Sequence, residues 1–209
     1  MKILIADDHS VVREGLKQIL KKLPDVNQIE EAMNGIDALK MIESSNYDFV
    51  ILDITLPGIS GLDILKSLKL QNNNTRILVL SMHPEEQFAI RALKLGAVGY
   101  VTKDRAGEEL LAAIRKISGG RKYVSSELAE FMALNLDYRF DSLLHEKLSE
   151  REFQIMIQLA SGKSSRDIAA ELFISEKTVG THRLRIMRKM GMKKNSDLTF
   201  YAIKNKLIE

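Results

Sequence analysis

The chain has 209 residues, 45% of them hydrophobic and none of them cysteine, which excludes disulfides and cysteine-ligated metal centres and allows one or two domains. Its 31 basic and 28 acidic residues nearly balance, yet residues 143–209 hold 13 basic and 8 acidic ones, and residues 1–142 hold 18 and 20. This asymmetry predicts two domains with different partners.

The sequence also argues against a membrane protein. No apolar stretch approaches the roughly 20 residues that a membrane-spanning helix needs. The N-terminus leads directly into a strand-like run, without the basic region and long apolar stretch of a signal peptide. We therefore expect a cytoplasmic protein with no membrane partner.

Residues 1–118 alternate strand-like runs with amphipathic helical ones. Residues 2–6, 49–52, 77–80 and 98–101 are largely apolar, as in buried strands, whereas residues 26–31 alternate apolar and polar side chains, as in an edge strand. Apolar residues recur at helical spacing in residues 11–23, 36–42, 62–68, 88–93 and 110–117. This α/β alternation predicts a doubly wound, five-stranded parallel sheet with the strand order 2-1-3-4-5.

Each of the four apolar strands leads into chemically functional side chains. Asp7 and Asp8 follow the first of these strands, Asp53 follows the second, and Ser81 and Lys103 follow the last two. The carboxyl ends of parallel strands lie along one edge of a sheet, where open α/β sheets bind ligands. Asp7 or Asp8 alone would be read as a helix cap, but the joint pattern predicts one site.

This set of side chains fits phosphoryl transfer. Three carboxylates need a cation nearby, and Mg²⁺ prefers oxygen ligands, including the backbone carbonyl of Thr55. The Asp53 carboxylate can attack phosphorus and form an acyl phosphate. Lys103 would neutralise charge on the phosphoryl oxygens, and the Ser81 hydroxyl would bond the attached group.

Residues 2–118 resemble the receiver domain of two-component response regulators, which has a CheY-like sheet. The resemblance rests on Ala6-Asp7-Asp8-His9, Ile51-Leu52-Asp53, Leu56-Pro57-Gly58, Leu80-Ser81 and Gly99-Tyr100-Val101-Thr102-Lys103-Asp104. It implies Mg²⁺ at Asp8, Asp53 and the Thr55 carbonyl, with Asp7 assisting through water. It also implies that Asp53 accepts a phosphoryl group from a phosphohistidine of a sensor histidine kinase. Ser81 and Tyr100 match the hydroxyl and the aromatic residue that move on phosphorylation.

Residues 119–142 are expected to form a linker with one helix. Gly119 and Gly120 end the last helix of the receiver-like region, as glycines at helix C-termini do. Residues 125–137 then show helical spacing, and residues 138–142 show no period. We therefore predict three segments: a receiver domain in residues 1–118, a linker in 119–142, and an all-helical domain in 143–209.

The C-terminal domain reads as four helices. Ser149 and Glu152 form a capping box that opens a helix over residues 150–160, and Ser164 caps a short helix over residues 168–172. A tight turn at residues 173–174 leads to a long helix over residues 176–190, which Ser175 caps and Gly191 ends. Asn195 is expected to cap a last helix over residues 196–205. A short helix, a tight turn and a longer basic helix make a helix-turn-helix.

One face of the long helix is basic. Residues 177–194 hold seven basic and no acidic residues, whereas solvated surface helices ordinarily mix both signs. This face therefore predicts contact with the phosphates of double-stranded DNA. The predicted DNA-binding residues are Lys177, Thr178, Gly180, Thr181, Leu184, Arg185 and Arg188.

Residues 143–209 resemble the LuxR/FixJ/NarL type of DNA-binding domain. The motifs are Leu148-Ser149-Glu150-Arg151-Glu152, Asp167-Ile168-Ala169, Ile174-Ser175-Glu176-Lys177-Thr178-Val179 and Thr181-His182. The resemblance implies that residues 176–190 form the recognition helix and that Leu198 and Ala202 on the last helix make a dimer contact. Gly180 departs from the lysine or other large residue common at its position.

The sequence thus predicts a NarL/FixJ-type response regulator in which phosphorylation of Asp53 promotes homodimerisation and sequence-specific DNA binding. One alternative is a constitutive DNA-binding regulator whose receiver serves only for oligomerisation. A second is an aspartyl-nucleophile phosphatase. Such enzymes usually carry a second carboxylate two residues after the nucleophile, where this chain has Thr55.

Overall fold

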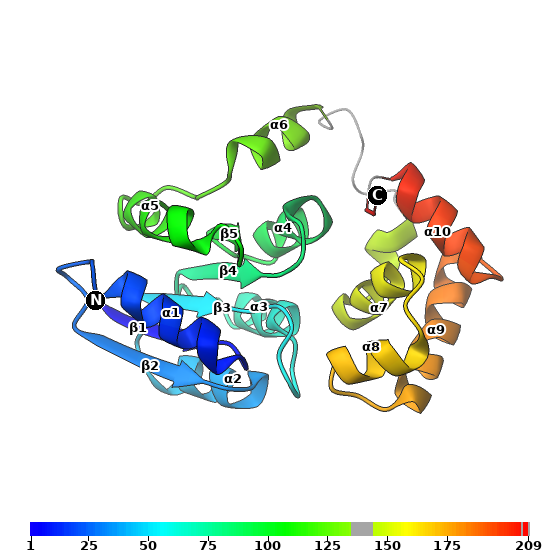
Figure 1. The fold of residues 1–209 in the computed structure, drawn as a ribbon, viewed down its shortest axis with the longest axis horizontal. Coiled ribbons are helices and arrows are strands. Elements are labelled where there is room, and N and C mark those ends of the chain that lie inside the picture. Colours follow the sequence, from blue (N-terminus) through cyan, green and yellow to red (C-terminus); the bar gives the residue numbers. More distant parts are fainter. Residues whose placement is uncertain (135–143, 206, 209) are drawn as a thin grey trace. The chain divides into compact units, whose positions relative to one another are not determined.

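The computed structural model describes residues 1–134, 144–205 and 207–208, in two compact units (Figure 1). The first unit is Met1–Ala129 and the second is Glu130–Glu209. The predicted boundaries at residues 118 and 142 stay predictions, and the part of the predicted linker in residues 135–142 lies outside the described residues.

The first unit is built on the five-stranded parallel sheet that the sequence predicts. Its strands are β1 (Lys2–Ala6), β2 (Gln28–Ala32), β3 (Phe49–Leu52), β4 (Ile77–Ser81) and β5 (Gly99–Thr102). Their order is β2-β1-β3-β4-β5, and all four pairings are parallel. β2 begins two residues later than expected, because the amide of Val26 bonds back to Leu23 in the preceding turn.

Helices cover both faces of the sheet (Figure 1). They are α1 (Ser10–Leu20), α2 (Gly35–Ser44), α3 (Gly61–Leu70), α4 (Glu85–Lys94) and α5 (Ala106–Ser118). The side chains of α1 and α5 pack with alternate strand residues such as Ile5 and Ile51 in one continuous core. The intervening strand residues, such as Leu52 and Tyr100, are buried toward the other helices. The sheet is therefore covered on both faces and leaves its strand ends open for a site.

The segment after α5 packs on the first unit. The Tyr123 amide donates to the Val98 carbonyl at 2.8 Å, beside the edge strand β5. Helix α6 (Ser126–Leu134) follows, and its first turn is anchored because the Ser125 hydroxyl accepts from the Leu128 amide and donates to the Glu85 carboxylate. Leu128 is fully buried. The start of the predicted linker helix is thus attached to the first residue of α4.

The second unit is helical. A 3-10 turn, η2 (Leu144–Lys147), precedes α7 (Glu150–Ala160), α8 (Ser165–Glu171), α9 (Glu176–Met190) and α10 (Asn195–Lys204). The capping box at Ser149 forms as the sequence predicts, and Gly191 ends α9 with a φ of 69°. The turn between α8 and α9 places Phe173 at a φ of 54°, which completes a helix-turn-helix.

One predicted cap is wrong. Asn195 is the first residue of α10, and its side-chain oxygen accepts from Nε of Arg183 at 2.8 Å. The Asp197 carboxylate instead accepts the amides of Lys193 and Lys194. An aspartate inside the first turn therefore fixes this helix start, and it also complements the positive end of the helix dipole.

Candidate functional site

The backbone of the sheet fixes the predicted polar residues at one edge. The amides of Asp7, Asp53 and Lys103 each donate to a neighbouring strand, to the carbonyls of Ala32, Ala6 and Ser81 respectively. The parallel ladder thus extends one residue beyond the named strands. The side chains that follow β1, β3 and β5 are consequently brought together, as the sequence predicts.

Lys103 joins the two buried carboxylates of this edge. Its ammonium lies 2.7 Å from Oδ2 of Asp7 and 2.7 Å from Oδ2 of Asp53, and all three side chains are almost completely buried. Oδ1 of Asp53 accepts the Thr55 amide at 3.1 Å. Buried ions that are paired and hydrogen-bonded in this way hold a fixed geometry, because breaking one contact leaves an uncompensated charge.

The acidic side chains also form a potential cation site. Ligand atoms of Asp7, Asp8, His9 and Asp53 all lie within 4.8 Å of one another. Three carboxylates face one ammonium here, so the site has an excess of hard, anionic oxygens, which is the donor set that Mg²⁺ prefers. The residues therefore fit the predicted Mg²⁺.

His9 was not among the predicted site residues. Its Nδ1 lies 2.9 Å from Oδ1 of Asp8 and 3.3 Å from Oδ1 of Asp7, and most of its side chain is exposed. Its place directly after the Asp7-Asp8 pair is the only sequence signal for this position.

Burial changes the acid–base properties of the site. Burial raises the pKa of Asp53 to about 6, although Lys103 acts in the opposite direction. Burial alone would lower the pKa of Lys103, but the charges of Asp53 and Asp7 outweigh it and the net pKa is raised. The lysine therefore stays charged at neutral pH, and Asp53 remains mostly ionised while being close to the range in which it takes up a proton.

Ser81 and Tyr100 both contact the loop that follows β4. The Ser81 hydroxyl accepts the His83 amide at 3.1 Å, and the Tyr100 hydroxyl donates to the His83 carbonyl at 2.8 Å. Both side chains are fully buried, so Tyr100 points inward. One loop residue thus connects the two predicted switch positions.

Arg13 is a buried part of the site that the sequence did not reveal. Its Nη1 donates to the Asp7 carbonyl at 2.9 Å, and its Nε donates to Glu31 at 2.7 Å. Lys17 also contacts Glu31, at 2.8 Å. Arg13 lies within the amphipathic pattern of α1, where a cation is ordinarily assigned to solvent, so its sequence position gives no signal for burial.

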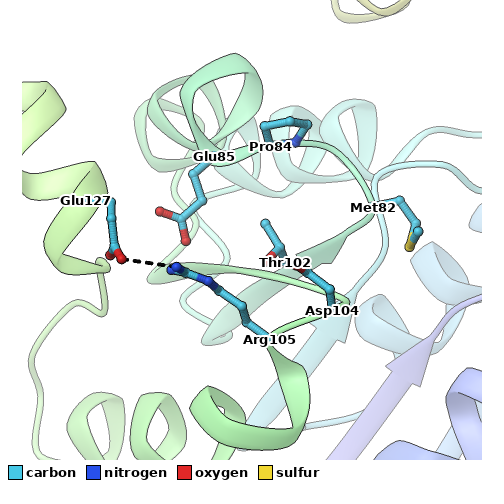
Figure 2. A pocket seen from close by; sticks show the side chains of 7 residues that line it. All are labelled: Met82, Pro84, Glu85, Thr102, Asp104, Arg105 and Glu127. Atoms are coloured by element: carbon cyan, nitrogen blue, oxygen red, sulfur yellow. Dashed lines mark hydrogen bonds and ion pairs between the residues drawn. The ribbon is translucent and has the colours of Figure 1, made fainter.

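A pocket of about 440 Å³ adjoins this edge (Figure 2). Its lining consists of Met82, Pro84, Glu85, Thr102, Asp104, Arg105 and Glu127. The Arg105 guanidinium pairs with Glu127 of α6 at 3.1 Å, the contact that is dashed in Figure 2. The pocket thus runs from the residues beside Ser81 and Lys103 to the start of the linker helix.

The predicted DNA-binding residues lie on α9, opposite its buried side. Val179, Ile186 and Met190 are buried in the second unit, as predicted. Lys177, Thr181, Leu184, Arg185 and Arg188 are exposed, and Thr178 and Gly180 are half-buried. Thr178 also belongs to the helix cap, because its amide donates to the Ser175 hydroxyl at 3.1 Å.

The two predicted dimer-contact residues are not at the surface. Leu198 and Ala202 are both fully buried, on the side of α10 that packs against α7. Both side chains belong to the core of the second unit, so their predicted dimer contact stays a prediction, and their burial argues against it. The large apolar residues exposed on α10 are Phe200 and Ile203, at 72% and 51% exposure.

Comparison with known families agrees with this geometry. Residues 3–115, more than half of the chain, match the family described as "Response regulator receiver domain". The chain is a response regulator. Residues 146–202 match "Bacterial regulatory proteins, luxR family", so the response regulator combines a receiver domain with a LuxR-type DNA-binding domain. Both family resemblances found in the sequence are thereby confirmed.

Full-length relatives share this organisation. The chain is 37% identical to the oxygen regulatory protein NreC of Staphylococcus aureus, with complete coverage of both chains. It is 32% identical to the response regulator UvrY of Escherichia coli, over 99% of this chain and 95% of that protein.

Solved structures also resemble the response regulator. A LuxR-family two-component response regulator from Aurantimonas is 33% identical with a TM-score of 0.60, over 65% of this chain and 96% of that one. The RcsB–DNA complex, at 24% identity, has a TM-score of 0.61 over 100% of this chain and 99% of that one, which shows the fold. Within the described residues, every helix is too short or too polar to cross a bilayer.

Proposed function

We propose that reversible phosphorylation of Asp53 controls DNA binding through α9. The observation that carries this proposal is the placement of Asp53, whose two carboxylate oxygens contact the Lys103 ammonium at 2.7 Å and the Thr55 amide at 3.1 Å. The carboxylate is buried yet mostly ionised at neutral pH, because its pKa is about 6. It is held as a nucleophile that needs no additional base.

The transfer reaction uses few groups. An Asp53 oxygen attacks the phosphorus of a phosphohistidine on a sensor histidine kinase, the P–N bond breaks, and the imidazole leaves with a proton from solvent. The product on Asp53 is an acyl phosphate. Lys103 neutralises charge on the phosphoryl oxygens, and the Ser81 hydroxyl donates to one of them.

Mg²⁺ would be held by Asp8, Asp53 and the Thr55 carbonyl, with Asp7 assisting. The bound ion supplies positive charge that offsets repulsion between the carboxylates and the phosphoryl group. The clustering of the acidic oxygens within 4.8 Å supports this assignment. We further propose that the receiver assists only its own phosphorylation and dephosphorylation, with no other substrate, and that the protein works in the cytoplasm.

The output is binding of double-stranded DNA by a homodimer. The basic residues exposed on α9 support contact with phosphates, and a dimer would present two such helices to adjacent half-sites. We propose that Phe200 and Ile203, rather than Leu198 and Ala202, carry the dimer contact on α10. Substituting both by serine should lower the dimer fraction in sedimentation while leaving the circular dichroism unchanged.

Labelling with a small phosphodonor tests the central claim. Treatment with acetyl phosphate and Mg²⁺ should attach one acid-labile phosphoryl group, and Asp53→Ala should abolish it. Asp25→Ala, which removes an exposed carboxylate elsewhere in the same unit, serves as the matched control and should be labelled normally. Label that persists in Asp53→Ala would remove Asp53 from this role.

A further inference from the structure

The DNA-facing side of α9 has an apolar centre. Lys177, Thr181, Leu184 and Arg188 recur at helical spacing and form one stripe about 16 Å long, with a cation at each end. Helix α9 is described along its whole length, and Leu184 is its only exposed large apolar side chain, at 68% exposure. A leucine at the middle of a basic surface contributes nothing to a phosphate contact.

The residues around Leu184 add to this apolar character. The Thr181 hydroxyl donates to the Lys177 carbonyl at 3.0 Å, so it is occupied within the helix and the γ-methyl group remains for outside contacts. Thr181 lies three residues before Leu184, which places the two side chains next to each other. The centre of the stripe therefore offers methyl groups and no free hydrogen-bond donor.

Gly180 has no side chain, so the helix backbone beside this centre is accessible to another molecule. A Cβ added at Gly180 would have no atom within 4 Å, so packing within the described part of the chain does not require glycine there. Glycine inside a helix is also less favourable than alanine. A position that is unfavourable for the helix and unconstrained by its own unit leaves room for the close approach of another molecule.

We propose that Thr181 and Leu184 read the C5-methyl groups of thymines in the major groove, with Gly180 permitting the close approach of the helix. This inference rests on the proposed DNA binding. Thymine presents the only methyl group among the base edges of the major groove, whose width of about 12 Å admits one helix. The stripe length lets Lys177 and Arg188 reach phosphates while its centre lies on the base edges.

Methyl readout by α9 fixes part of the operator sequence. Each half-site contains one or two T·A pairs whose thymine methyl groups contribute to affinity. At these positions the protein discriminates by apolar contact rather than by the paired hydrogen bonds that arginine makes with guanine. Loss of one such methyl contact should weaken binding about four-fold.

Thymine-to-uracil replacement removes only the methyl group and therefore tests the claim directly. Duplexes would first be selected from a random-sequence library with the full-length protein activated by beryllofluoride. Each thymine of a selected duplex is then replaced singly by deoxyuridine, and the dissociation constants are measured. We expect losses of about four-fold at one or two positions in each half-site and none elsewhere.

Variants assign the effect to the stripe. Leu184→Ala should bind the thymine and uracil duplexes equally at one of these positions, whereas Leu70→Ala, which truncates an exposed leucine of the first unit, should keep the four-fold difference. Gly180→Ala should weaken DNA binding although its added methyl group meets nothing in the protein, and its thermal stability should not fall.

The possible outcomes distinguish methyl readout from the proposed DNA binding on which it rests. Selected duplexes that bind tightly but tolerate uracil at every position would overturn methyl readout and leave DNA binding intact. Unchanged DNA affinity in Leu184→Ala would likewise overturn it and assign the leucine to a protein partner. Failure to select any duplex would overturn the proposed DNA binding, and the inference with it.

Discussion

The two charged sites of the response regulator differ in where their counter-charges come from. At the receiver edge, Lys103 contacts two buried carboxylates of its own unit. On α9, no carboxylate in the described part of the chain forms an ion pair with Lys177, Arg185 or Arg188. A buried charge needs a partner within the protein, because a lone buried charge is costly. An exposed charge is solvated by water and can pair with another molecule. The first site thus neutralises much of its own charge, whereas the charges of the second remain available to another molecule.

Removing the lysine of the buried site should have the largest effect. Lys103→Met leaves Asp7 and Asp53 without their shared cation, and it should lower the unfolding free energy of the first unit by about 3 kcal/mol at neutral pH. Hydrogen exchange of the β1 and β3 amides would measure the loss. A change below about 0.5 kcal/mol, the range of ordinary surface substitutions, would erase the contrast between the two sites.

Titration of Asp53 provides the second test. Its folded pKa of about 6 exceeds the ordinary value of 3.8, so the folded state binds this proton more tightly than the unfolded one. The stability linked to this group is therefore fully present below pH 4 and is lost as the pH rises through 6. Carbon-detected NMR of the carboxyl group should give a midpoint near 6 without metal. Mg²⁺ should lower this midpoint, and Lys103→Met should raise it; movement in the opposite directions would contradict the assignment of the charges.

An intermediate case lies within the second unit. Glu152 is buried and its pKa is lowered, since contacts with Lys189 and the Ser149 cap outweigh the effect of burial, while Lys189 itself is partly exposed. Lys189→Met should therefore cost about 1 kcal/mol, between the buried and exposed extremes. It should also raise the Glu152 pKa, so that acid unfolding of this unit begins at a higher pH than in the unmodified protein. An equal acid profile in both proteins would mean that the pair contributes nothing.

The exposed face should show the smallest effect on stability and a clear effect on DNA. Lys177→Ala should change the unfolding free energy by less than about 0.5 kcal/mol. The slope of the logarithm of DNA affinity against the logarithm of salt concentration should fall by about one, because one phosphate contact is lost. Lys21→Ala, which removes an exposed lysine from the first unit, is the matched control and should leave the slope unchanged.

The sheet edge was predictable because its signal is repeated. Four strands of similar composition each end in a suitable side chain, and a parallel sheet aligns those ends regardless of loop details. The placement of Asp7, Asp53 and Lys103 therefore followed from strand position alone. The burial of Arg13 could not be predicted from strand position, since it depends on Glu31 lying at the end of the neighbouring strand β2.

The last helix shows a different limit. Leu198 and Ala202 are spaced to lie on one side of α10, but the helix also carries the apolar residues Phe200 and Ile203. The sequence alone therefore does not say which side of the helix faces the core. Packing against α7 decides this, and it buries the pair that the resemblance had assigned to the dimer. A helix with apolar residues on two sides needs tertiary information before either side can be given a function.

The attachment of α6 has a consequence for signal transmission. Ser125 both caps the first turn of α6 and holds Glu85, which is only four residues beyond Ser81. The loop between Ser81 and Glu85 is therefore connected to the start of α6 through this hydrogen bond. If Asp53 is phosphorylated as proposed, a rearrangement of this loop would have a covalent and hydrogen-bonded route to the polypeptide that leads to the DNA-binding domain.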